Sequence, residues 1–143
     1  MEAWDFVRMM ECALAVASVR LFGERGNALR RVMGEIMAEM LKDRVPDDPR
    51  EALRELLEPL AEVEIDGDEV RVKECRVCYS AMLLDVATES ELDTIRRVVP
   101  CPIVNLFNQL AELKGWNVRL EPEVTPLSGE TDPGSCVQRL QEE

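Results

Sequence analysis

The segment EVEIDGDEVRVK, residues 62–73, decides the fold class of this chain. Its valines and its isoleucine alternate with charged residues on both sides of Asp66-Gly67, a dipeptide typical of tight turns between paired strands. Alternation with a period of two places apolar side chains on one face of a strand and charged side chains on the other. The segment therefore predicts a β-hairpin with one buried face and one face in water.

The sequence before the hairpin has the apolar spacing of helices. Residues 3–21 and 29–41 each carry an apolar side chain at about every third or fourth position, and glycines separate the two runs. A third helix is expected at Asp48-Pro49, because aspartate suits an N-cap and proline suits the first helical position. We expect the apolar faces of these helices, including the methionines of the second, to pack in the core.

The sequence after the hairpin predicts further helices. Residues 81–87 fit either a strand or a helix. Ser90 is a candidate N-cap for a short helix that follows. Pro102 then opens another helix, and Gly115 ends it in the usual C-terminal position.

Two strands are expected at the end of the chain. Residues 116–120 alternate between apolar and polar side chains, and a short strand follows Cys136. Together the patterns predict a single α+β domain over residues 1–143. We expect an antiparallel sheet with helices packed on one face, in the order N-terminal helices, hairpin, helices and two final strands.

The charge of the chain limits its partners. Asp and Glu number 29 and Lys and Arg 17, which gives a net charge of −12. Such a surface repels nucleic-acid phosphates and anionic lipid headgroups over about 10 Å. No apolar run approaches the roughly 20 residues that span a bilayer, and the acidic start lacks the basic residues of a signal peptide. We therefore expect a cytoplasmic protein with no nucleic-acid partner and no membrane span.

The cysteines are the most concentrated chemistry in the sequence. Cys75, Cys78, Cys101 and Cys136 fall in the second half, and the first two form a C-x-x-C that lets two sulfurs reach one metal ion. In a reducing compartment, grouped cysteines are ligands or nucleophiles rather than disulfides. Soft thiolates favour zinc or an iron–sulfur cluster such as 4Fe-4S. Cys12, within the first helix, is expected to be a core residue.

Cys101 could have a second role. It precedes Pro102 and would be the N-cap of a helix, whose positive end lowers the pKa of a thiol. A thiolate there could be a metal ligand or the nucleophile of an enzyme, although the chain has no histidine to activate it. Two other interpretations of the C-x-x-C stay open, namely buried structural thiols and a thioredoxin-like redox pair.

Several segments between about residues 25 and 140 follow the order of a known family. They are the glycine-containing helix LRRVMGEIMAEML (29–41), a leucine-rich helix, the hairpin, a cysteine before a helix, a strand, and an ending like Gly-Asp-Pro-x-Cys, here GETDPGSC (129–136). In these features the chain resembles the vinyl-4-reductase domain family. The resemblance implies an α/β domain related to vesicle-tethering subunits, an assembly that is often dimeric and here is expected to be a homodimer, and binding of small or hydrocarbon-like molecules.

The resemblance also implies a metal site. In sensor proteins that carry this domain, cysteines and a glutamate hold a zinc ion. By position, the resemblance assigns two of those cysteines to Cys101 and Cys136 and places the glutamate near Glu121 or Glu123.

The chain departs from the family pattern at one ligand. A third family cysteine falls near Thr125, which cannot supply a thiolate, and the segment 129–136 is two residues longer than the usual ending. Cys75 and Cys78 could supply the missing sulfur, for zinc or, with four thiolates, for an iron–sulfur cluster. We therefore expect a metal-stabilised small-molecule-binding domain, with a dimeric assembly subunit or a cysteine-dependent enzyme as alternatives.

Overall fold

The structure is a computed structural model that describes residues 1–128 and 131–142. Gly129 and Glu130, which begin the family-like ending, lie outside the described residues. In chain order the elements are α1 (Ala3–Phe22), η1 (Gly23–Arg25), α2 (Gly26–Leu41), α3 (Pro49–Leu57), β1 (Glu62–Asp66), β2 (Glu69–Lys73), α4 (Ser80–Val86), α5 (Glu89–Arg96), α6 (Pro102–Lys114), β3 (Val118–Val124), η2 (Pro126–Ser128) and β4 (Cys136–Glu142). The predicted α+β class and the order of its elements are confirmed.

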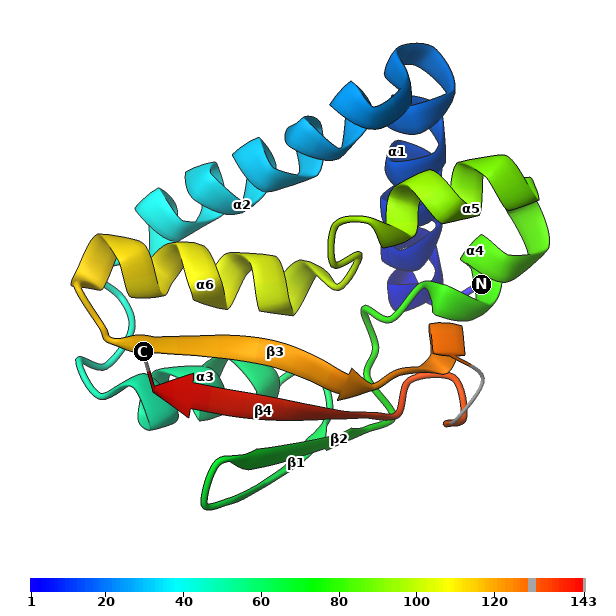
Figure 1. Ribbon diagram of the computed structural model, residues 1–143. Coiled ribbons are helices and arrows are strands. Elements are labelled where there is room, and N and C mark those ends of the chain that lie inside the picture. The colour runs from blue at the N-terminus through cyan, green and yellow to red at the C-terminus, as the bar shows by residue number, and fades with distance from the viewer. Residues whose placement is uncertain (129–130, 143) are drawn as a thin grey trace.

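The strands form one antiparallel sheet in the order β1-β2-β4-β3. The predicted hairpin is present, with Val63 opposite Val72 and with Gly67 in the turn at a φ of 61° that glycine adopts without strain. β4 pairs with β2 as well as with β3 and places Cys136 opposite Val72. The last strand, β4, therefore lies inside the sheet, beside β2 of the hairpin (Figure 1).

One face of the sheet is covered by helices. Apolar side chains of β2, β3 and β4 pack against α3 and α6, and the charged residues that alternate with them face away. Figure 1 shows α6 lying along the sheet and α2 lying outside α6. The main core cluster consists of Leu53, Leu57, Val70, Val72, Val77, Ile103, Val104, Phe107, Leu120 and Leu140.

α2 packs against α6 through small residues, and its apolar face points outward. A Cβ on Gly34 would lie 3.6 Å from the Asn105 backbone, and Ala38 is fully buried. The prediction that the methionine-rich face of α2 is core is therefore wrong: small residues allow the close helix approach, so the bulky face stays outside. We call this surface the exposed α2 face, which consists of Leu29, Val32, Met33, Ile36, Met37 and Met40.

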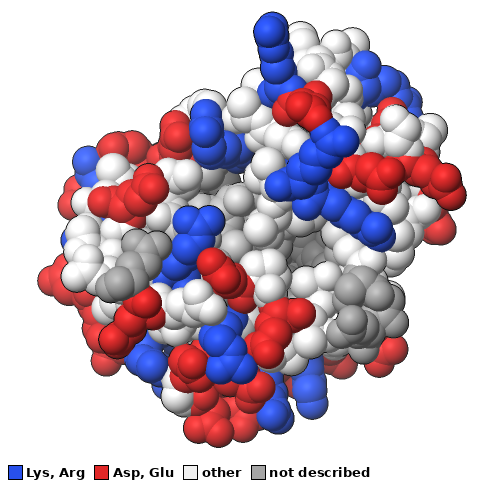
Figure 2. Space-filling model, in the orientation of Figure 1, with Lys and Arg blue, Asp and Glu red and all other residues white. Residues whose placement is uncertain are grey.

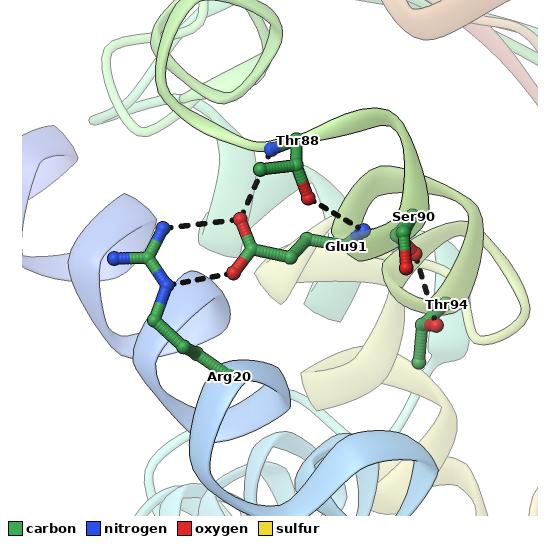
Figure 3. A network of polar contacts seen from close by, with 5 residues as sticks. All are labelled: Arg20, Thr88, Ser90, Glu91 and Thr94. Carbon is green, nitrogen blue, oxygen red and sulfur yellow. Dashed lines mark hydrogen bonds and ion pairs between the residues drawn. The ribbon is translucent and has the colours of Figure 1, made fainter.

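Two contacts fix α1 against its neighbours. At Gly26, a Cβ would lie 2.3 Å from the carbonyl oxygen of Ser18, so only glycine allows the backbone of α2 to cross α1 this closely. Arg20 of α1 pairs with Glu91 of α5 at 2.7 Å (Figure 3). Cys12 is buried in the cluster between α1, α4 and α5, as the sequence predicted.

The region of ambiguous prediction is helical. Residues 81–87 lie mostly in α4, and the N-cap of α5 is Thr88 rather than Ser90. The Thr88 hydroxyl accepts the Glu91 backbone N–H at 3.2 Å, while the Glu91 carboxylate accepts the Thr88 N–H at 3.0 Å (Figure 3). This reciprocal pair satisfies two N–H groups at once, which explains why the helix starts two residues earlier than predicted.

The surface mixes acidic and basic side chains. On the face that Figure 2 shows, both signs are interspersed among uncharged residues. Across the part of the chain that the structure describes, no helix has both the length and the apolarity needed to cross a membrane.

Candidate ligand and metal site

A cavity of about 430 Å³ lies beside the inner face of the sheet, near the start of α6. Its lining is mainly apolar and includes Leu57, Val72, Val99 and Ile103. A cavity of this size and composition falls within the range of small-molecule sites in proteins.

All four cysteines of the predicted site line this cavity. Cys75 and Cys78 lie in the loop between β2 and α4, Cys101 is the N-cap of α6, and Cys136 is the first residue of β4. Three segments that are distant in the sequence thus contribute thiols to one space. Burial is the main cause of the raised pKa values of Cys101 and Cys136. A thiolate at Cys75 or Cys136 would raise the pKa of Cys101 further, and a thiolate at Cys75 or Cys78 would raise that of Cys136 further.

The backbone brings the final segment to the C-x-x-C loop. The Cys75 N–H donates a hydrogen bond to the Gly134 carbonyl at 3.0 Å. A Cβ on Gly134 would lie 3.2 Å from the Cys75 nitrogen, and the φ of Gly134 is 83°. Glycine is therefore needed at this position, both for space and for backbone conformation. This contact, next to the β2–β4 pairing, places Cys136 beside the loop.

The thiols of the cavity have raised pKa values. Burial raises the pKa of Cys101 to about 12, although the backbone N–H groups of Val104 and Ile103 lower it. The predicted N-cap position is confirmed, but the predicted lowering of the thiol pKa is wrong, because desolvation outweighs the helix end. Burial likewise raises the pKa of Cys136 to about 11 and that of Cys75 above its ordinary value. These three thiols are therefore neutral at pH 7 in the protein without metal.

The number of cysteines and their sulfur donors suit a soft metal, but their side chains do not point toward a common centre. Within residues 1–128 and 131–142, no group of three or more His, Cys, Asp or Glu side chains is placed to hold a metal ion. Metal binding therefore requires the thiols to lose their protons and the sulfurs to turn toward a common point.

The two glutamates implied by the family resemblance differ in position. Glu121 is exposed and faces Arg119 at 3.5 Å, and it is not part of the cavity wall. Glu123 lines the cavity, but its Oε2 accepts a hydrogen bond from Arg139 Nε at 3.1 Å and forms an ion pair with Arg139 Nη2 at 3.0 Å. Thr125 also lines the cavity, where the family has a third cysteine.

Sequence reasoning missed two buried residues of the cavity that carry polar groups, Tyr79 and Gln138. Tyr79 is buried and donates its hydroxyl to the Pro100 carbonyl at 2.8 Å. Gln138 is 3 % exposed and lies on the inner face of β4, two residues from Cys136. Alternation along the last strand, applied from Cys136 onward, would have identified Gln138 as an inward-facing residue. No comparable local signal marks Tyr79.

The fold and the cavity together define an α+β domain with a cysteine-lined apolar pocket. No protein-family model matches the chain, and no curated protein matches it.

Proposed function

We propose that this chain is a metal-stabilised domain that binds a small apolar molecule in its cysteine-lined cavity. One observation carries the proposal: four cysteines from three separate segments line a single, mainly apolar cavity. The resemblance to the vinyl-4-reductase family points in the same direction. A cavity that is apolar over most of its wall favours a hydrocarbon-like ligand, because such a ligand gains about 25 cal/mol for each Å² removed from water.

Cys75, Cys78, Cys101 and Cys136 would hold the metal. Four thiolates are a tetrahedral donor set for zinc, with a 4Fe-4S cluster as the alternative. When bound, the metal would cross-link the C-x-x-C loop, the start of α6 and the start of β4. Because the free thiols of Cys101 and Cys136 have high pKa values, binding releases protons, and metal affinity rises with pH.

Gln138 supplies a polar anchor for a ligand. Its Nε2 donates to Cys136, and its buried Oε1 has no hydrogen-bond partner among the described residues. A buried acceptor without a partner is costly, so a ligand with one hydroxyl or N–H group would gain by donating to it. We therefore expect the preferred ligand to be mainly apolar with a single donor group.

Filling the cavity tests ligand binding directly. Val99→Trp places a large side chain in the cavity wall, whereas Val98→Trp, at an exposed neighbouring position, does not. We expect the fluorescent apolar probe 1-aminoanthracene to bind the wild type and Val98→Trp, and to bind Val99→Trp at least about tenfold more weakly. Equal binding to all three proteins would contradict a ligand site in this cavity.

A second candidate function is homodimeric assembly, and the exposed α2 face supports it. Six apolar side chains, at positions 29, 32, 33, 36, 37 and 40, form one continuous stripe along α2 and are each at least 41 % exposed. A stripe of this length is costly to leave in water. A second copy would offer the same stripe, which is the requirement for a two-fold symmetric interface.

Use of Cys101 as an enzyme nucleophile has the least support. Its pKa of about 12 leaves almost no thiolate at neutral pH. The chain has no histidine to take the proton.

A further inference from the structure

Arg30 of α2 is a buried cation with unused donors. Its side chain is 8 % exposed, and its Nη2 donates to the Ile95 carbonyl at 3.2 Å and to the Asn27 side chain. Its Nε and Nη1 have no hydrogen-bond partner among the described residues. Burying a guanidinium with unpaired N–H groups costs free energy, so this arrangement needs an acceptor from elsewhere.

A small pocket of about 80 Å³ lies against Arg30, between α1, α2 and α6. Tyr79 and Asn105 line it, and Leu14 and Met37 form part of its apolar wall. The pocket shares Tyr79, Pro100 and Pro102 with the cysteine-lined cavity, but none of the four cysteines lines it. It is therefore a separate candidate site.

The other polar groups of the pocket do not neutralise Arg30. The Tyr79 hydroxyl donates to the Pro100 carbonyl and lies close enough to interact with the Arg30 guanidinium, but burial keeps the phenol neutral, so it supplies no counter-charge. Asn105 Nδ2 donates to the Val99 carbonyl at 3.1 Å. Glu11 also lines the pocket, but it makes no ion pair with Arg30, and its buried Oε2 has no partner in the described part of the chain. Burial raises the pKa of Glu11 to about 7, so near neutral pH it spends much of its time uncharged and able to donate.

We propose that this Arg30 pocket binds the carboxylate of a small organic acid, with Nε and Nη1 of Arg30 donating to its oxygens. Arginine recognises carboxylates through several N–H groups at once, which makes a carboxylate the best match for these donors. The volume suits a head group of a few heavy atoms, since a water molecule occupies about 30 Å³. Leu14 then contacts the apolar part of the acid.

Acetate is the probe for this site, with the full chain as the protein. In a ¹⁵N-labelled sample, the Arg30 Nε–H signal, assigned with Arg30→Lys, should shift saturably with sodium acetate. Sodium chloride at the same ionic strength should leave it nearly unchanged. The absence of a shift, or an equal shift with chloride, would mean that the pocket holds water or takes anions without selection, and would overturn the proposal.

A carboxylate built into the chain provides the second test. Met37 is 41 % exposed at the pocket wall, so substitution there should not disturb folding. Met37→Glu should compete for Arg30 and weaken the acetate response at least about tenfold, while Met37→Gln should change it by less than about threefold. Loss of the response in both variants, or in neither, would overturn the proposal.

Discussion

Gln138 Nε2 donates a hydrogen bond to Cys136 Sγ at 3.3 Å, between two residues on the same face of β4. The bond lowers the pKa of Cys136, but burial outweighs it and raises the pKa to about 11. The amide nitrogen of Gln138 is thus bonded to a thiol, while the amide oxygen, Oε1, has no partner among the described residues. A buried amide oxygen without a partner is costly, so this oxygen calls for a donor from outside the described residues.

Replacing this amide should separate its role in the site from its role in stability. We expect Gln138→Met to change the free energy of unfolding by less than about 1 kcal/mol, because an unpaired buried oxygen is removed together with the bond. The pH at which Cys136 becomes alkylated should rise. Mass-spectrometric mapping of iodoacetamide labelling against pH in the metal-free protein measures this. Gln141→Met, at the exposed end of the same strand, is the control; a fall in the labelling pH for Gln138→Met would refute the account.

Glu11 should make stability depend on pH. Burial raises its pKa from 4.5 to about 7, although Arg8 lowers it. The folded protein therefore holds the proton more tightly than the unfolded chain, and this contribution is complete below about pH 4.5 and is lost as the pH rises through 7. Urea unfolding of Glu11→Gln at pH 5 and pH 8 should show a smaller loss of stability across this range than the wild type, by about 1 kcal/mol after solvent screening.

The control for this measurement is Glu55→Gln, a change at an exposed position of α3. It should keep the pH dependence of the wild type. If Glu11→Gln also keeps that dependence, the carboxyl of Glu11 is not the group responsible.

The exposed α2 face should control the oligomeric state. Ile36 lies in the middle of the stripe and is 56 % exposed. We expect the wild type to sediment as a dimer and Ile36→Glu as a folded monomer, because a charge in the centre of an apolar interface must be desolvated on association. Leu84→Glu makes a similar change at an exposed position of α4 and should leave the dimer intact. A wild type that is monomeric at every concentration would exclude this interface.

The start of α5 can be tested by capping variants. Thr88→Ala removes the hydroxyl that accepts the Glu91 N–H and should cost about 1 kcal/mol of stability. Ser90→Ala, at the position that the sequence suggested, should cost less than about 0.5 kcal/mol, since it removes no cap. Thermal or urea unfolding measures the loss of stability in each variant. A larger loss for Ser90→Ala than for Thr88→Ala would show that Ser90 is the N-cap.

The sequence predicted the elements that depend on local signals. The Asp66-Gly67 turn, the Asp48-Pro49 helix start and the Cys101-Pro102 helix start all need only neighbouring residues, and all three are present. The exposed α2 face was missed for a physical reason. Helical spacing shows which side of a helix is apolar, but only the tertiary contacts made by residues such as Gly34 decide whether that side is covered.

The candidate site depends on contacts between distant segments. The C-x-x-C spacing indicated that Cys75 and Cys78 lie together, and the family resemblance suggested Cys101 and Cys136. No local pattern gives the strand order β1-β2-β4-β3, which sets Cys136 opposite Val72 and completes the cavity. The sequence also could not show the burial that raises the pKa of Cys101, because that burial comes from the assembled cavity rather than from the helix end.

Metal content is the most direct measurement of the central claim that the four cysteines share one metal. Anaerobically purified wild type should be colourless and contain about one zinc per chain. Cys101→Ser and Cys136→Ser should lose the metal, and Cys12→Ser, a buried cysteine outside the cavity, should retain it. A brown sample that contains iron and sulfide would show that the same residues hold an iron–sulfur cluster instead of zinc. A wild type without stoichiometric metal, or a Cys101→Ser protein that keeps it, would contradict the claim.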